Sequence, residues 1–207
     1  MVATLSPRTT ITAINETTTT ISGGSAAPTQ FRFQLDANRL ESLIRGAIVT
    51  QPHTYSDWGG AVTAWVYIPR DRAQVWHHIT HYSRWTEYFP DVTRSEVLGV
   101  VAAGVTRKRL YQTAQKSFFL LNLEVEVFLD VIEQPETGDT IAFRLERGSL
   151  RDFAADLWLY PYQQGTILSY RVQATPTIPV PSCFIQQAMQ MDLPNNLRQM
   201  RQVMCRG

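Results

Sequence analysis

The sequence predicts an α+β domain in which an antiparallel sheet packs against a long C-terminal helix. The middle of the chain alternates apolar and polar residues, with turn residues at short spacing, which is typical of a meander of strands. Two short helical segments precede this meander, and one long amphipathic segment follows it. An antiparallel sheet with one apolar face needs a cover, and the last predicted helix is the longest element that can provide it.

The first thirty residues differ in composition from the rest of the chain. Residues 1–30 carry two charged side chains, Arg8 and Glu16, among many Thr, Ser, Gly and Ala residues. Such a segment cannot bury enough apolar surface to offset the entropy of ordering, so we expect a disordered tail. A Ser/Thr-rich, acid-poor start leaves a transit peptide to an organelle stroma or matrix as an alternative.

Residues 31–57 are expected to form a short amphipathic helix and a linker. Asn38 and Glu41 fit a capping pattern, and five apolar residues recur on one helical face: Leu40, Leu43, Ile44, Ala47 and Ile48. Three roles stay open for residues 38–48: docking on the main domain, contact with a partner or a second copy, and transient attachment to a membrane surface. Residues 50–60 are interpreted as a turn-rich linker.

The main domain is expected over residues 58–207. It starts with a strand at 61–68, a helical stretch opened by Pro69, and a short helix around Trp85 that Pro90 stops. The predicted strands of the meander then follow, over residues 97–101, 105–116, 118–133, 140–146, 153–160 and 166–175. A helix over 183–204, capped by Ser182 and interrupted near Pro194, ends the chain.

The composition excludes several classes of protein. The 207 residues are 44% hydrophobic, which suffices for one core, and 19 basic against 18 acidic residues argue against nucleic-acid binding by bulk charge. Cys183 and Cys205 would lie about 33 Å apart on one helix, so a disulfide scaffold is excluded. No run reaches the roughly 18 apolar residues of a membrane span, and no apolar signal-peptide core is visible, so we expect a cytoplasmic protein.

The sequence contains no complete motif for catalysis, for a metal site or for a cofactor. His77 and His81 share a helical face as in zinc enzymes, but His78 occupies the position of the required Glu and no third ligand is near, so no metal is expected. The sequence has no G-x-S-x-G nucleophile motif, and its Gly-rich stretch lies in the tail, so no cofactor is expected. Glu124 and Glu126 are expected on a solvated outer face of the sheet.

A set of aromatic and helical motifs resembles the START/SRPBCC superfamily, in particular its polyketide cyclase/dehydrase and lipid transport group with the coenzyme-Q-binding branch. These motifs are Trp76, Ile79, Tyr82, Trp85, Tyr88-Phe89-Pro90, the strand pair around Trp158 and Tyr170, and Leu193-Pro194-Asn195-Asn196-Leu197. The resemblance covers about residues 60–205. It implies a helix-grip fold, in which a curved antiparallel sheet wraps around a long C-terminal helix and leaves a deep cavity for an apolar molecule.

The resemblance and the strand alternation together suggest which side chains line the cavity. They are Trp85, Phe89, Tyr111, Phe143, Trp158, Tyr170, Met189 and Met191. Arg109 is a further candidate for holding a carbonyl or carboxylate of the ligand. Alternatively, Arg107 and Arg109 face solvent or pair with Glu124 and Glu126 across the sheet.

The favoured function is non-enzymatic binding or transport of a hydrophobic small molecule, such as a lipid, an isoprenoid quinone or a polyketide. The first alternative is a cyclase-like or aromatase-like enzyme, in which Arg109, Tyr111, Asp152 or Tyr170 polarises a polyketone. The second is a protein-assembly factor with a vestigial cavity.

Overall fold

The structure is a computed structural model that describes residues 35–103, 105–118, 121–135 and 139–206. All of them belong to one compact unit, Phe33–Gly207. The expected disordered tail, residues 1–30, lies outside the described residues.

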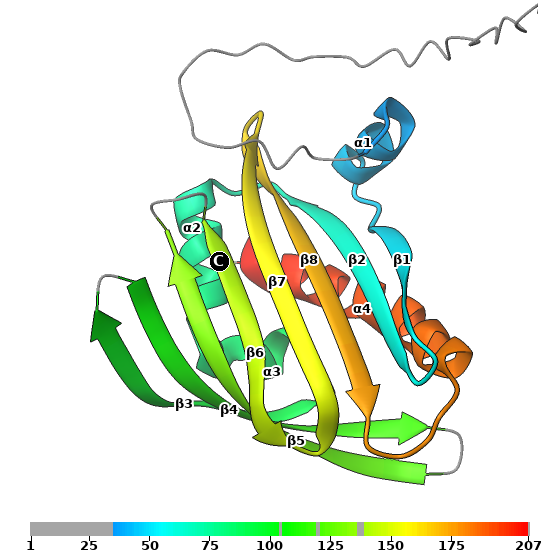
Figure 1. The fold of residues 1–207 in the computed structure, drawn as a ribbon. Coiled ribbons are helices and arrows are strands. Elements are labelled where there is room, and N and C mark those ends of the chain that lie inside the picture. The colour runs from blue at the N-terminus through cyan, green and yellow to red at the C-terminus, as the bar shows by residue number, and fades with distance from the viewer. Residues whose placement is uncertain (1–34, 104, 119–120, 136–138, 207) are drawn as a thin grey trace, which may run out of the picture. The chain divides into compact units, whose positions relative to one another are not determined.

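Eight strands form one antiparallel sheet with the order β1-β2-β8-β7-β6-β5-β4-β3 (Figure 1). Their bounds are β1 (Val49–Ser56), β2 (Gly59–Ile68), β3 (Val92–Ala103), β4 (Val105–Phe118), β5 (Leu121–Gln134), β6 (Thr140–Gly148), β7 (Leu150–Tyr162) and β8 (Gly165–Pro176). Strands β3 to β8 follow one another as a meander, and β2 closes onto β8. The predicted antiparallel sheet is thereby confirmed.

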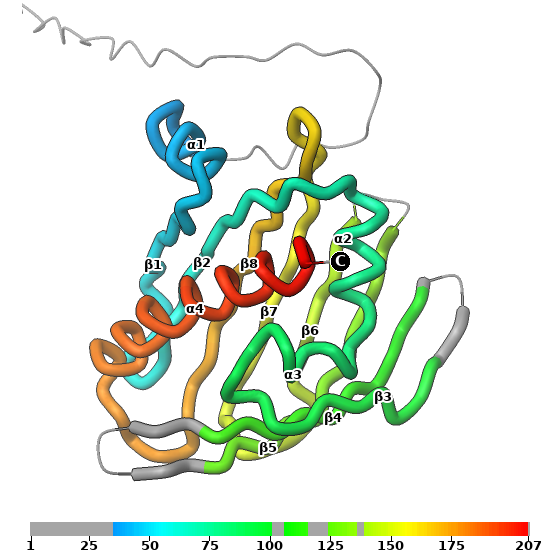
Figure 2. Tube along the Cα trace, turned by 180° about the vertical axis from the view of Figure 1, so that it is seen from behind, coloured from blue at the N-terminus to red at the C-terminus, as the bar shows by residue number. Residues whose placement is uncertain are grey.

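The helices α2 (Arg72–Thr80), α3 (Trp85–Tyr88) and α4 (Ser182–Cys205) lie on one side of the curved sheet, as Figure 2 shows. A short 3₁₀ turn, η1 (Tyr82–Arg84), joins α2 to α3. The long helix α4 crosses the concave face, so the predicted cover is confirmed together with the α+β helix-grip architecture.

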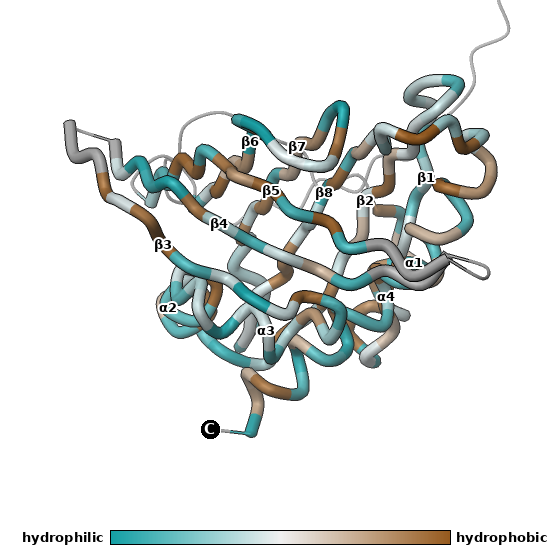
Figure 3. The backbone as a smooth tube through the Cα atoms, turned by 90° about the horizontal axis from the view of Figure 1, so that it is seen from below, coloured by the Kyte–Doolittle hydropathy of each residue, from teal (hydrophilic) through white to brown (hydrophobic). Residues whose placement is uncertain are grey.

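The core lies between the concave face and these helices. Hydrophobic and hydrophilic residues alternate along β5 in Figure 3, and Val127, Leu129 and Val131 are the strand's buried side chains in the core. Strand β2 contributes Val62, Ala64, Val66 and Ile68 in the same way, which the period of two along a strand explains.

The amphipathic helix predicted near residue 38 is α1 (Ala37–Ile44), and its cap differs from the prediction. Asp36, not Asn38, is the N-cap, and its carboxylate accepts a hydrogen bond from the backbone N–H of Arg39 at 2.9 Å. Leu43 is fully buried in a small cluster with Trp65 and Ile167. Trp65 alternates with the core residues of β2, so this cluster lies on the opposite face of the sheet. The contact agrees with the docking interpretation.

The interpretation of residues 50–60 as a linker is wrong. Residues 49–56 form the edge strand β1, which pairs with β2 from Val49 opposite Trp65 to Ser56 opposite Gly59. An edge strand needs a partner on one side only and tolerates Pro52, so its sequence lacks the apolar alternation of the inner strands.

Helix α4 also differs from the prediction at two points. Pro181 occupies the N-cap position, and Ser182 is already helical, its backbone N–H donating to the carbonyl of Asp57 at 3.0 Å. The helix continues through Pro194 without interruption. Proline removes one helical hydrogen bond, and burial of Leu193 and Leu197 on either side of it favours the helical path.

Candidate functional site

A cavity of about 340 Å³ lies between the concave face of the sheet and the first half of α4. Strands β3, β4, β5, β7 and β8 supply its wall on one side, and α3 closes one end. The side chains of α4 that line it share one helical stripe: Ile185, Ala188, Met189, Asp192, Leu193 and Asn196. Its volume falls within the range of about 300–1,000 Å³ that is usual for ligand pockets.

Strand β8 runs along the length of the cavity. Its lining residues Tyr170, Val172, Ala174 and Pro176 alternate along the strand and so share one face over about 20 Å. Ile178, which also lines the cavity, is 39% exposed, whereas Tyr170 is 6% exposed. The cavity therefore has an open end near Ile178 and a closed end at Tyr170.

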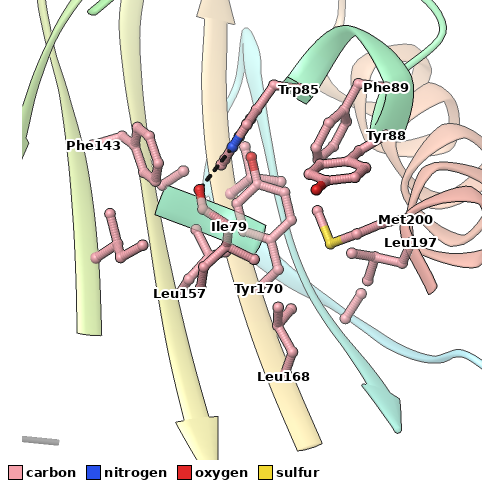
Figure 4. Close-up of a cluster of buried hydrophobic side chains, with 14 of the residues drawn as sticks. Ile79, Trp85, Tyr88, Phe89, Phe143, Leu157, Leu168, Tyr170, Leu197 and Met200 are labelled. Carbon is pink, nitrogen blue, oxygen red and sulfur yellow. Dashed lines mark hydrogen bonds between the residues drawn. The ribbon is translucent and has the colours of Figure 1, made fainter. Parts of the chain in front are cut away.

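Three aromatic rings form the closed end (Figure 4). The rings of Trp85 and Phe89 stack with their centroids 5.2 Å apart, and Phe89 meets the Tyr170 ring edge to face at 6.1 Å. The indole N–H of Trp85 donates to the carbonyl of Ile79 at 2.9 Å, so this polar group already has a partner. Phe143 packs against Trp85 at 5.1 Å and supports it from the core.

Polar groups on the wall are few, and two of them bond to neighbouring side chains. The Gln112 amide donates to the Ser95 hydroxyl at 3.0 Å, and the hydroxyls of Thr113 and Thr93 lie 2.8 Å apart. None of the described lining residues is Arg, Lys or His, and Asp192 is the charged side chain among them. This wall suits a neutral, apolar guest.

Four of the predicted lining residues are on the cavity: Trp85, Phe89, Tyr170 and Met189. Phe143 lies one layer behind, in the packed core. The prediction that Tyr111, Trp158 and Met191 line the cavity is wrong. Trp158 is half-buried between the inward residues Leu157 and Leu159, so it points to the other face.

The prediction for Met191 fails because of the geometry of the helix. It is 63% exposed, because two positions along a helix from Met189 correspond to a rotation of about 200°. The same geometry explains missed residues: Ile185, Asp192 and Leu193 line the cavity, lie three or four positions from Met189 and could have been found from it.

Arg109 lies on the outer face of the sheet and does not reach the cavity. Its guanidinium donates to the Glu146 carboxylate, with Nε 2.9 Å from Oε2, and Arg107 forms a bidentate pair with Asp130 at 2.5 and 2.6 Å. The expected pairing across the sheet is therefore present, with Glu146 and Asp130 in place of Glu124 and Glu126. Leu110, which follows Arg109 in β4, is buried in the core, so Arg109 and Arg107 point to the opposite face of the sheet.

Tyr111 and Asp152 are also bonded away from the cavity. The Tyr111 hydroxyl donates to the Glu126 carboxylate at 3.0 Å, and its ring packs on Phe128 with centroids 4.8 Å apart. Asp152 accepts a hydrogen bond from the hydroxyl of Tyr55. Tyr170 is thus the one residue of the cyclase hypothesis that reaches the cavity wall.

A second hollow, of about 660 Å³, lies beside α3 and the last turns of α4. Charged and polar side chains line it, and the guanidinium of Arg84 pairs with the Glu87 carboxylate at 2.9 Å. Burial and the nearby Arg84 hold the pKa of His78 below its ordinary value. The hollow is open and internally ion-paired, so the apolar cavity is the better candidate site.

The described residues show neither a metal-binding cluster nor a membrane-spanning helix. Within residues 35–103, 105–118, 121–135 and 139–206, no three His, Cys, Asp or Glu side chains are grouped so that they could hold a metal ion. His77 and His81 lie side by side with ring centroids 6.4 Å apart. No helix of the described part of the chain is long and apolar enough to cross a membrane.

Solved structures that share the fold include the following three. A START superfamily protein from Mycobacterium smegmatis is 13% identical, with a TM-score of 0.57 over 69% of this chain and 98% of that one. A STAR-related lipid transfer protein fragment from Xanthomonas axonopodis is 14% identical, with a TM-score of 0.56 over 75% and 98%. Zhui aromatase/cyclase from Streptomyces sp. R1128 is 13% identical, with a TM-score of 0.54 over 72% and 94%.

A comparison with curated protein sequences finds no significant match. The family model described as polyketide cyclase/dehydrase and lipid transport matches residues 68–201, which is more than half of the chain. The matched segment contains α2 and α3, strands β3 to β8 and most of α4, and therefore most of the cavity wall. The chain belongs to the polyketide cyclase/dehydrase and lipid transport family, a START-like group, whose fold its sheet and long C-terminal helix share.

Proposed function

We propose that the protein binds or transports a hydrophobic small molecule in the cavity under the first half of α4. The observation that carries the proposal is the cavity of about 340 Å³, walled by Trp85, Phe89 and Tyr170 at its closed end and by aliphatic side chains along its length. Burying the apolar surface of a guest against such a wall is favourable, at roughly 25 cal/mol per Å².

A cyclase-like enzyme is the second candidate. The aromatase/cyclase from Streptomyces shares the fold, but its low identity carries no activity over to this chain. A cyclase needs convergent polar groups to move protons on a polyketone. Arg109 and Tyr111, which were expected to serve that role, bond to Glu146 and Glu126 on the outer face. This placement favours a carrier over an enzyme.

The assembly-factor alternative requires that side chains fill the cavity. The cavity volume of about 340 Å³ argues against it. Lipids, isoprenoid quinones and polyketides all stay candidate guests within the carrier proposal. The coenzyme-Q-binding branch and the cytoplasmic location are further predictions, which ligand identification and cell fractionation would test.

Native mass spectrometry of the purified full chain tests the proposal. We expect a fraction of the protein to carry an extra mass of a few hundred daltons, because a guest that fills such a cavity is a small molecule. Solvent extraction should release that molecule in stoichiometric amount. A protein that shows its bare mass, and that takes up no apolar compound when incubated with a lipid and quinone extract, would contradict the proposal.

A further inference from the structure

The hydroxyl of Tyr170 is an unusual polar group in the cavity wall. Tyr170 is 6% exposed and sits at the closed end, where its ring reaches from β8 toward Trp85 and Phe89 (Figure 4). No hydrogen bond to another side chain or to the backbone is found for its hydroxyl within the described residues, and the oxygen is not one of their fully buried unpaired polar atoms, so it borders the open volume of the cavity. A hydroxyl that borders an apolar cavity loses its hydrogen bond when an apolar guest displaces water from it, unless the guest itself accepts that bond.

The other polar groups around the closed end already have partners. The Trp85 N–H donates to the Ile79 carbonyl, and the Gln112 amide donates to the Ser95 hydroxyl. Phe89 and Phe143 add only apolar surface. The Tyr170 hydroxyl is therefore the group best placed to hydrogen-bond to a guest at this end.

The charge of the wall limits what that guest can be. No basic residue is among the described lining residues, and Asp192 adds an acidic side chain. A carboxylate or phosphate at the closed end would lose its hydration without gaining a cation, which is strongly unfavourable. Burial, and to a lesser degree Asp156, raises the pKa of Tyr170, so its phenol stays protonated at neutral pH and can donate.

We propose that Tyr170 selects the guest: the cavity takes a neutral, mainly apolar molecule whose carbonyl or hydroxyl oxygen accepts a hydrogen bond from Tyr170 Oη at the closed end. This inference rests on the proposed function and adds to it the polarity and charge of the ligand class. In this proposal the ring of Tyr170 is part of the apolar wall, and its hydroxyl determines which guests bind.

Three naphthalenes of similar shape test the inference on the full chain. Ethylnaphthalene, acetylnaphthalene and naphthoate, each substituted at the same ring carbon, present a hydrocarbon, a ketone and a carboxylate. Their affinities are measured at neutral pH by displacement of N-phenylnaphthylamine. We expect the ketone to bind the unmodified protein more tightly than its hydrocarbon counterpart after correction for their transfer free energies from water to oil. We expect naphthoate to bind at least about tenfold more weakly than the ketone.

The Tyr170→Phe variant then removes the oxygen and keeps the ring. The affinity for the ketone should fall about tenfold, which corresponds to about 1.4 kcal/mol, while that for the hydrocarbon stays unchanged. The control is Tyr88→Phe, since Tyr88 is also buried, its hydroxyl lies 3.3 Å from the His78 carbonyl, and it does not line the cavity. That control should change neither affinity.

The outcomes separate this inference from the proposed function. If no naphthalene displaces the probe and no apolar probe binds, the carrier proposal fails. If the hydrocarbon binds and Tyr170→Phe leaves the ketone affinity unchanged, or lowers both affinities equally, the Tyr170 inference fails and the carrier proposal stands. Naphthoate binding as tight as the ketone contradicts the charge argument. A lower melting temperature of unliganded Tyr170→Phe would assign the hydroxyl a structural bond and overturn the inference.

Discussion

The two halves of helix α4 belong to one continuous helix but face different surroundings. In the second half, Leu197, Met200 and Met204 are fully buried in the packed core. In the first half, Ala188 and Met189 are half-buried and line the cavity. The difference shows that one element both completes the core and roofs the candidate site, so stability and ligand binding should separate along its length.

The contacts on either side of Pro194 explain the difference. The second half packs against α3, where the Gln199 amide donates to the Glu87 carbonyl at 3.3 Å. The first half is fixed to β2 along one flank, where the Gln186 amide bonds to the backbone of Ala61 at 3.1 and 2.8 Å. Its other flank faces the cavity, where no side chain of the sheet fills the volume.

Three methionines on this one helix give the largest expected contrast. Met200→Ala should lower the free energy of unfolding by about 2–5 kcal/mol, because its side chain is fully packed. Met189→Ala should cost about 1 kcal/mol, since part of its surface already faces the cavity. Met191→Ala should stay within about 0.5 kcal/mol, because the residue is exposed. Urea unfolding of the three variants checks this order, and equal losses for Met189 and Met200 would contradict it.

The second largest effect is expected where the first half of α4 contacts β2. A Cβ added at Gly60 would lie 2.9 Å from Met189 Sδ and 3.1 Å from the backbone nitrogen of Gln186, so α4 would have to shift. We expect Gly60→Ala to lower the free energy of unfolding by about 1–3 kcal/mol through this overpacking. Gly99→Ala on β3 is the control, because a Cβ there meets nothing within 4 Å. A neutral Gly60→Ala would show that this flank is loosely held.

A smaller effect concerns pH and the packed half. Burial and Arg84 lower the pKa of His78 in the folded protein below its ordinary value of 6.5. When the pH falls just below 6.5, His78 therefore takes up a proton in the unfolded chain before it does so in the folded protein. The stability contribution of this residue is therefore fully present above pH 6.5 and is lost as the pH falls toward the folded pKa. His78→Gln should show a weaker pH dependence of the melting temperature than the unmodified protein.

The cavity should not follow that pH dependence. None of its described lining residues is a histidine, so the affinity for a neutral apolar probe should stay constant between pH 8 and pH 6 while the melting temperature falls. Parallel titration and thermal unfolding measure the two quantities. A probe affinity that falls together with the melting temperature would show that the two halves of α4 do not behave independently.

The sequence was enough to predict the sheet, its order along most of the chain and the covering helix, because alternation and helical periodicity are local signals. The sequence did not predict β1, because an edge strand requires little apolar surface and therefore lacks a clear alternation. It also left the direction of Arg109 open, since alternation shows that Arg107 and Arg109 share a face but not which one. The burial of Leu110, next to Arg109 in the strand, supplies that information once the core is known.

The candidate site was predicted in part for the same reason. Tyr170 and Met189 face the cavity, but Met191 was predicted to line it together with Met189 although helical geometry separates them. The volume itself could not be predicted, because a void depends on how the curvature of the sheet and the path of α4 combine. The small side chain of a residue such as Ala188 leaves room for the cavity, and no sequence motif identifies such a residue.

Filling the cavity tests the central claim most directly. Ala188 lines the cavity, whereas the neighbouring Gln187 is exposed, so Ala188→Trp and Gln187→Trp add the same ring inside and outside it. We expect Ala188→Trp to abolish binding of N-phenylnaphthylamine with a modest loss of stability, because the ring has room to enter, and Gln187→Trp to bind the probe like the unmodified protein. If Ala188→Trp folds and still binds the probe with unchanged affinity, or if it unfolds the domain while Gln187→Trp does not, the account of a ligand cavity under the first half of α4 is wrong.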